Sequence, residues 1–233
     1  MLTIPQNIGS PVLYESGLDS LESCLDKDHF KNYTKQVSYK FNSRGFRDVE
    51  WPDDLSNVIW CVGDSFTVGL GQPFEETWPQ LLENKLNRRC LNLGQDRCSN
   101  DSMALRVNEI YKLYKPKLIL IMWSYLWRRR IDGKDVLFNP GEHGQNFLND
   151  IENFRKNVEK VCALDTKIIQ TTICTALDYF ESHPEYRQQK VFDHIIKPVP
   201  QLDYARDFHH FDVMTSEKFA QVFYDKIISH SIT

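Results

Sequence analysis

Short apolar segments separated by amphipathic stretches are the feature that most constrains this chain. Residues 118–124, with the sequence LILIMWS, are the strongest case, and residues 57–63, 90–94 and 167–173 are similar. Segments this short and this apolar are typical of strands buried on both faces. Between them, apolar residues recur at three- and four-residue spacing, which predicts amphipathic helices. The alternation therefore predicts βαβ units and a mostly parallel sheet with helices on both faces.

The same periodicity predicts where helices lie and where regular structure is missing. Four helices are expected, at residues 74–87, 99–114, 149–163 and 216–230. Ser99 or Asn100 is expected to cap the second of them. Residues 1–50 lack clear periodicity and are expected to form an irregular N-terminal arm with one short helix near residues 18–25. Residues 125–148 contain three consecutive arginines, a proline and three glycines, which indicates a long loop or lid. A helical excursion is expected within residues 177–200.

Composition and the absence of certain patterns limit the class of protein. No repeat or linker divides the chain, so we expect a single domain over residues 1–233. A net charge of −4 does not favour binding to nucleic-acid phosphates. No apolar run approaches the roughly 18 residues of a membrane span, and the first residues lack the pattern of a signal peptide. The six cysteines form no C-x-x-C pair, so reduced thiols and a cytoplasmic protein are expected.

Candidate chemistry lies just after the predicted strands, because ligands of open parallel sheets bind beyond the carboxyl ends of the strands. Ser65 follows the first strand in the sequence Gly-Asp-Ser, in a tight turn expected to open onto a helix. Gly94 follows the second strand, where the missing side chain lets a backbone N–H approach a ligand closely. A serine needs a base to become a nucleophile. Asp207 and His210 precede the last helix, and their spacing lets the carboxylate hold Nδ1–H while Nε2 faces a serine.

In this order and context, these blocks resemble the GDSL/SGNH hydrolase family. The lead-in at residues 39–48 and the phrase Ala-Arg-Asp at residues 205–207 are also similar to the family. The resemblance implies a three-layer α/β/α fold with a flavodoxin-like parallel sheet. It also implies hydrolysis or transfer of acyl esters without a metal or an organic cofactor.

The resemblance assigns roles to individual residues. Ser65 becomes the nucleophile, His210 the base and Asp207 the residue that orients the base. The backbone N–H groups of Ser65 and Gly94 become oxyanion donors. His209, beside the base, is expected at the rim of the site.

The chain departs from the family after the third strand. Family members have an asparagine donor there in a Gly-x-Asn-Asp block, whereas residues 122–128 contain neither glycine nor asparagine. Asn100 closely follows Gly94 and is the candidate for a replacement side-chain donor. Losing one such donor costs about 10²–10³ in rate. Trp123 and Arg128 are candidate substrate contacts at the same strand end. Packing of Trp123 against the sheet and a solvated run of arginines are the alternatives.

We therefore expect a serine esterase or acyl hydrolase that cleaves an ester of a glycan or small polar molecule. Two alternatives remain open. An O-acyltransferase would use the same residues, and a catalytically impaired binding module of the same fold would account for the missing asparagine block. Ser65 and Asp64 are also residues that commonly cap helices. A metal site is not expected, because the His-His pair lacks a known ligand spacing.

Overall fold

A four-stranded parallel sheet forms the centre of the computed structural model, which describes residues 13, 18–136, 147–174 and 194–229. The strands are β1 (Ile59–Gly63), β2 (Cys90–Gly94), β3 (Leu118–Trp123) and β6 (Lys167–Thr172). Their order in the sheet is β2-β1-β3-β6, and every pairing is parallel. The four predicted strands are confirmed, with shifts of one or two residues at their ends.

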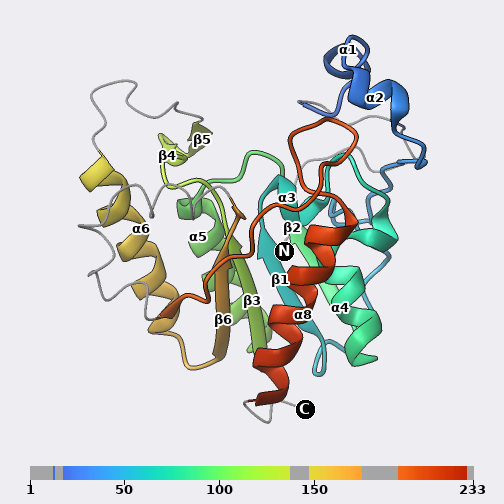
Figure 1. The fold of residues 1–233 in the computed structure, drawn as a ribbon. Helices are drawn as coiled ribbons and strands as arrows, with labels where there is room; N and C mark the ends of the chain where they lie inside the picture. The colour runs from blue at the N-terminus through green and yellow to red at the C-terminus, as the bar shows by residue number, and fades with distance from the viewer. Residues whose placement is uncertain (1–12, 14–17, 137–146, 175–193, 230–233) are drawn as a thin grey trace.

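Helices cover both faces of this sheet and make three layers (Figure 1). One face packs against α5 (Asn100–Tyr114) and α6 (Phe147–Cys162), and the other against α4 (Trp78–Leu86) and α8 (Val213–Ser229). Side chains of β3 alternate between the two cores. Ile119 and Ile121 face α5 and α6, whereas Leu120 and Met122 face α4 and α8. Each strand is apolar throughout because it has two dry faces.

The four predicted helices are present with adjusted ends. Ser99 caps α5, where its side-chain oxygen accepts a hydrogen bond from Ser102 N–H at 3.2 Å. The predicted helix at residues 74–87 is divided into a 3₁₀ turn, η1 (Phe74–Glu76), and α4. Most of the excursion expected at residues 177–200 lies outside the described residues. No helix in the described ranges is both long and apolar enough to cross a bilayer.

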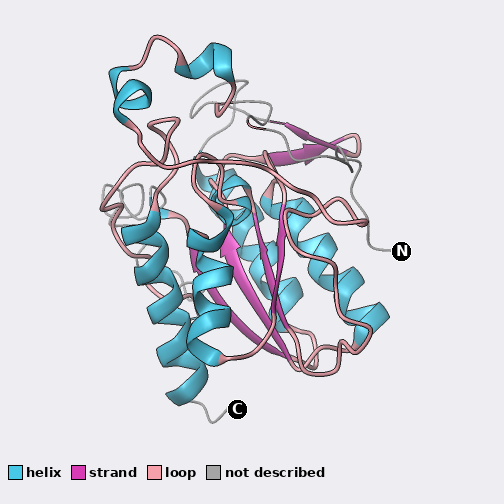
Figure 2. Cartoon of the chain, turned by 90° about the vertical axis from the view of Figure 1, so that its right-hand side faces the viewer, coloured by secondary structure: helices cyan, strands magenta, loops and turns pink. Residues whose placement is uncertain are grey.

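Two parts of the chain contain regular structure beyond the predicted elements. The arm contains α1 (Leu21–Cys24), near the expected position, and a second short helix, α2 (Asp28–Asn32). After β3, a hairpin forms from β4 (Arg129–Ile131) and β5 (Lys134–Val136). Figure 2 shows the arm and the hairpin at the same end of the sheet. That end is the carboxyl edge of the parallel strands, where the candidate residues are expected.

Candidate active site

Ser65 begins the short helix α3 (Ser65–Val68), directly beyond the end of β1. Asp64 caps this helix, because its Oδ1 accepts the Phe66 N–H at 3.1 Å. Gly69 ends the helix in a left-handed conformation, with φ at 77°. Within the described part of the chain, the Ser65 N–H has no backbone acceptor. The serine is thus held in a tight turn with an N–H group left for another partner.

His210 and Asp207 lie within hydrogen-bonding distance of this serine. His210 Nε2 is 2.8 Å from Ser65 Oγ, and His210 Nδ1 is 2.5 Å from Asp207 Oδ2. The other carboxylate oxygen, Asp207 Oδ1, accepts the N–H groups of His209 and His210. Burial opposes ionisation of Asp207, but the attraction of His210 and these hydrogen bonds outweigh it and lower its pKa to about 2. Asp207 therefore stays charged and fixes the orientation of the imidazole.

His209 occupies a different place from His210. Its Nε2 lies 3.2 Å from the hydroxyl of Tyr125, and its ring packs 5.9 Å from the ring of Phe66. Although the residue reaches solvent, partial burial and the charge of His210 lower the pKa of His209 to about 4. The position agrees with the rim location expected from the sequence.

The end of β3 is joined to the serine turn by a buried polar network. Ser124 Oγ donates to Asp64 Oδ2 at 2.5 Å, and Arg128 Nη1 donates to the same oxygen at 3.0 Å. Asn100 Nδ2 donates to the carbonyls of Ser124 and Tyr125, and its Oδ1 accepts the Ser124 N–H at 2.8 Å. The predicted role of Asn100 as an oxyanion donor is therefore wrong, because its amide holds the end of β3.

Gly94 also differs from its expected role. Its N–H donates to Asn92 Oδ1 at 2.9 Å, so it is not free to hold an oxyanion. The reason for a glycine here is space. A Cβ at this position would lie 2.3 Å from Val68 N and 2.8 Å from Thr67 C, both backbone atoms of α3. Gly94 thus lets the helix that carries Ser65 rest on the end of β2.

Replacing Gly94 by alanine is expected to lower the free energy of unfolding by at least about 2 kcal/mol, because the added methyl group overpacks the α3 backbone. Denaturant-induced unfolding followed by circular dichroism measures the change. Gly133→Ala is the control, because that glycine has a φ of 77° but nothing within 4 Å of an added Cβ. Backbone strain alone costs about 1 kcal/mol there. Equal destabilisation by the two substitutions would contradict the packing role of Gly94.

The prediction that Trp123 contacts a substrate is wrong. Its side chain is fully buried among the residues facing α5 and α6, and its Nε1 donates to Gln170 Oε1 at 2.9 Å. Its ring meets Phe154 edge to face at 5.7 Å. Since side chains alternate along a strand, Trp123 points into the same core as Ile121. The core-packing alternative weighed for this residue is the one observed.

The segment after β3 was expected to cover the serine, and its described part does so only at its beginning. Residues 125–128 border the site through Tyr125 and Arg128, whereas the β4–β5 hairpin lies over α5 and α6 (Figure 1). Arg130 N–H donates to Asp101 Oδ2 at 2.8 Å, and Arg129 forms an ion pair with Asp150. Of the loop or lid expected at residues 125–148, residues 129–136 therefore form a docked hairpin, and residues 137–146 lie outside the described residues.

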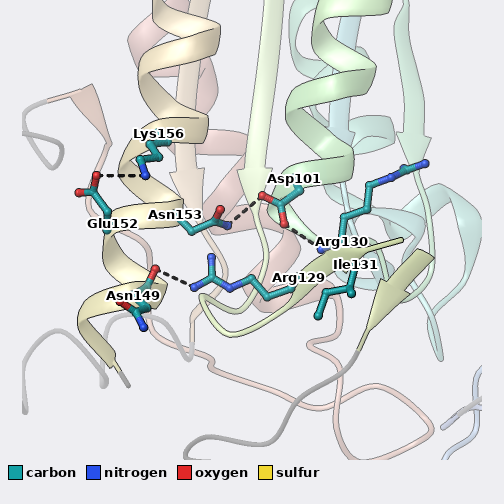
Figure 3. Close-up of a pocket in the computed structure, with 8 residues that line it drawn as sticks. All are labelled: Asp101, Arg129, Arg130, Ile131, Asn149, Glu152, Asn153 and Lys156. Atoms are coloured by element: carbon teal, nitrogen blue, oxygen red, sulfur yellow. Dashed lines mark hydrogen bonds and ion pairs between the residues drawn. The ribbon is translucent and has the colours of Figure 1, made fainter. Parts of the chain in front are cut away.

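A polar hollow of about 480 Å³ separates this hairpin from α6 (Figure 3). Arg129 reaches across it to the carbonyl of Asn149 at 2.7 Å, and Asn153 donates to Asp101 at 2.9 Å. Hydrogen bonds thus already join the polar groups on the two sides of the hollow. Two of the three consecutive arginines thus fasten the hairpin to the helices, and only Arg128 contacts the serine turn.

Asp96 is a charged residue of this edge that sequence reasoning missed. It follows β2 by two residues, its side chain is 17% exposed, and Arg97 Nε lies 3.7 Å from its carboxylate. Burial raises the pKa of the Asp96 carboxyl, and the attraction of His210 opposes that rise. Arg97 has a left-handed φ of 57°, uncommon for a residue with a side chain. No apolar pattern or motif in the sequence marks this turn.

The N-terminal arm fastens together the two loops that carry Ser65 and His210. The buried Asp19 carboxylate accepts two hydrogen bonds from Arg206, at 2.9 and 2.7 Å, and a third from Tyr39 Oη. The same tyrosine oxygen accepts the Gly71 N–H at 2.7 Å, and the Gly71 carbonyl accepts the Arg206 N–H at 3.0 Å. Because Arg206 precedes Asp207 and Gly71 follows α3, the arm fixes one loop against the other.

A buried arginine of the lead-in supports the serine loop from the same side. Arg47 donates to the carbonyls of Val68, Gly69 and Gln72, all in the turn that follows Ser65. Its side chain is almost fully buried, and its guanidinium also reaches the Ser38 carbonyl at 2.8 Å. Arg47 therefore anchors the backbone of the site from behind.

Several solved structures, two of them named as esterases, share this arrangement of strands and helices. The psychrotrophic esterase EstA from Pseudoalteromonas sp., inhibited by monoethylphosphonate, is 16% identical, with a TM-score of 0.52 over 76% of this chain and 100% of that chain. TesA is also 16% identical, with a TM-score of 0.52 over 73% of this chain and 97% of that chain. A carbohydrate esterase family 2 enzyme from Corynascus thermopiles (Myceliophthora fergusii) is 14% identical, with a TM-score of 0.50 over 79% of this chain and 69% of that chain.

These similarities show the fold. The chain shares a three-layer α/β/α architecture with these proteins, and the fold class expected from the sequence is confirmed. Neither the protein-family models nor the curated proteins give a match to this sequence.

Proposed function

We propose that this protein is a serine hydrolase that cleaves a carboxylic ester. The observation that carries the proposal is the continuous hydrogen-bonded chain from Ser65 Oγ through His210 to Asp207. A serine is a weak nucleophile until a base accepts its proton, and this chain supplies the base and the group that orients it. The structural similarity to the esterase EstA and to the carbohydrate esterase family 2 enzyme supports this assignment.

The reaction follows from the positions of these atoms. Ser65 Oγ attacks the ester carbonyl carbon while His210 Nε2 accepts the serine proton. Asp207 stabilises the imidazolium that results, and His210 then protonates the departing alcohol. Water attacks the acyl-enzyme with His210 again acting as base, which releases the acid and restores Ser65.

Backbone donors for the oxyanion come from the β1 and β2 ends of the sheet. The Ser65 N–H is one of them. Gly94 is occupied by Asn92, so we propose the turn at Asp96 and Arg97 as the source of the second donor. Within the described residues, neither N–H of that turn has a backbone acceptor.

For the substrate we propose an ester of a small polar molecule or a glycan. The similarity to a carbohydrate esterase supports this class, as do the charged residues Asp96 and Arg128 near the serine. We also propose that residues 1–233 act as one domain, because Asp19 and Arg47 of the arm hold both loops of the site. The binding-module alternative loses support, since a binding role does not require an aligned base and orienting carboxylate.

Covalent labelling tests the proposed function directly. A fluorophosphonate should form one adduct on Ser65, with loss of fluoride, detected by intact mass and peptide mapping. Heat-denatured protein should remain unlabelled, because the adduct requires a serine activated by the folded site. A folded protein that resists labelling, or one labelled at a different serine, would contradict the assignment.

A further inference from the structure

The proposed reaction places a negative charge on the substrate oxygen, and the β3 side of the serine lacks an obvious donor for it. Ser65 and the turn after β2 supply backbone N–H groups from the other side. Asn100 was the sequence-based candidate to replace the missing donor, but its amide is already hydrogen-bonded to the Ser124 and Tyr125 carbonyls. A different group must therefore provide any donor from the end of β3.

Arg128 is held at this position by hydrogen bonds of its Nη1 and by stacking of its guanidinium on the Tyr125 ring. Its Nη1 donates to Asp64 Oδ2 at 3.0 Å and to Ser124 Oγ at 2.9 Å. Its guanidinium lies 4.7 Å from the centre of the Tyr125 ring. The side chain is only 11% exposed, and Asp64 immediately precedes Ser65 in the chain. A long side chain is thus held rigidly beside the serine turn.

The remaining donors of this guanidinium have no partner in the described part of the protein. A guanidinium carries five N–H donors, and the two on Nη1 are used by Asp64 and Ser124. Among the described residues, neither Nε nor Nη2 of Arg128 contacts a protein acceptor, and neither nitrogen is fully enclosed. Three N–H donors therefore remain accessible on a side chain that is otherwise mostly buried.

The positive charge of Arg128 acts on two ionisable groups of the site, His209 and Asp96. Its positive charge helps lower the pKa of His209 and opposes the rise in the pKa of Asp96. The buried Asp64 carboxylate accepts a hydrogen bond from Arg128 Nη1, so the opposite charges of the pair are held in fixed positions. Such preorganised charge stabilises a developing oxyanion more strongly than water does.

We propose that Arg128 is the oxyanion donor on the β3 side and so a catalytic residue of the proposed hydrolase. When Ser65 Oγ bonds to the carbonyl carbon, the π electrons move onto the oxygen, which accepts a hydrogen bond from Nε or Nη2 of Arg128. When the intermediate collapses, those electrons reform the carbonyl, the ester C–O bond breaks, and the alcohol takes a proton from His210. This inference rests on the proposed ester hydrolysis.

A simpler role would also explain the contacts of Arg128, namely that it only neutralises the buried Asp64. The two roles separate in a double-mutant comparison of Arg128→Met, Asp64→Asn and the combined variant. Neutralisation predicts that the double variant performs like Asp64→Asn. Oxyanion stabilisation predicts that the double variant has a kcat about 10²–10³-fold below Asp64→Asn, with KM changed by less than about threefold.

The measurement is steady-state hydrolysis of a short activated ester, with each variant's folding checked by thermal unfolding. Arg130→Gln is the matched control, because that arginine lies on the hairpin and donates to Ser102 Oγ. It should retain kcat within about twofold, as expected for a surface change away from the site. If Arg128→Met does not fold because it leaves Asp64 unpaired, the comparison of the double variant with Asp64→Asn still decides the question.

Two results would overturn the role of Arg128: full kcat in Arg128→Met, or a double variant equal to Asp64→Asn. Ser65→Ala and fluorophosphonate labelling, run in parallel, keep this failure distinct from failure of the proposed function. Labelled Ser65 and inactive Ser65→Ala, together with active Arg128→Met, would reject Arg128 alone. An active Ser65→Ala variant would reject the hydrolase mechanism itself.

Discussion

Replacing Ser65 by alanine is expected to lower turnover of a short activated ester by at least about 10³-fold. The residues of a Ser-His-Asp triad act as one unit, so removal of the nucleophile removes nearly all the rate enhancement of that unit. The fold should be retained, because the substitution removes only one hydroxyl and its hydrogen bond to His210. Such a bond contributes about 1 kcal/mol to stability. Initial rates of ester hydrolysis at equal protein concentration measure the effect.

Ser43→Ala is a suitable control for this experiment. Ser43 lies on the exposed surface of the lead-in, and its N–H and hydroxyl donate to the Glu50 carboxylate. Its replacement should leave the rate unchanged. Near-wild-type hydrolysis by Ser65→Ala would show that another residue is the nucleophile.

Replacing His210 by alanine is expected to reduce turnover as much as Ser65→Ala, whereas His209→Ala should retain most activity. His210 Nε2 contacts Ser65 Oγ, while the adjacent His209 contacts the Tyr125 hydroxyl. The two histidines are thus a matched pair, one residue apart in the chain. The double variant Ser65→Ala/His210→Ala should be hardly slower than either single variant, because effects within one catalytic unit are not additive.

The same ester assay, with substrate concentration varied, separates kcat from KM for each variant. A larger loss in His209→Ala than in His210→Ala would reject the assignment of the base. Additive losses in the double variant would show that Ser65 and His210 do not act in one unit.

The strands and the order of the blocks could be predicted because their signals are local. β3 is apolar over its whole length, and Gly63 and Gly94 mark the ends of two strands. The spacing of Asp207 and His210 also suggested their contact, since three residues in a turn keep two side chains together. These features depend on neighbouring residues, and a sequence displays them directly.

The wrong predictions for Gly94, Trp123 and Asn100 concern side-chain contacts that the sequence does not display. Nothing in the sequence shows that Asn92 turns back to accept the Gly94 N–H, so the glycine was given the wrong role. Trp123 was assigned to the site because it ends a strand, but alternation directs it into the core. Asn100 meets Ser124, 24 residues away, which no local pattern reveals.

The hairpin after β3 was missed for a related reason. Its strands have three residues each, and most of their side chains are charged. They are held by hydrogen bonds to Asp101 and Ser102 rather than by an apolar face. Without alternating hydrophobicity, a segment of this kind resembles a loop in the sequence.

The hydrogen bonds of Asp19 with Tyr39 and Arg206, called the clamp from here on, have a consequence for how the protein is synthesised. Asp19 and Arg206 are 187 residues apart, and Ser65 and His210 are 145 residues apart. A nascent chain that has formed β1, β2 and β3 already holds its serine, but it has neither the base nor the arginine that closes the clamp. The site is therefore completed only when residues 206–210 have emerged and packed against Asp19 and Ser65. A partly made chain that ends before His210 therefore carries Ser65 without its proposed base.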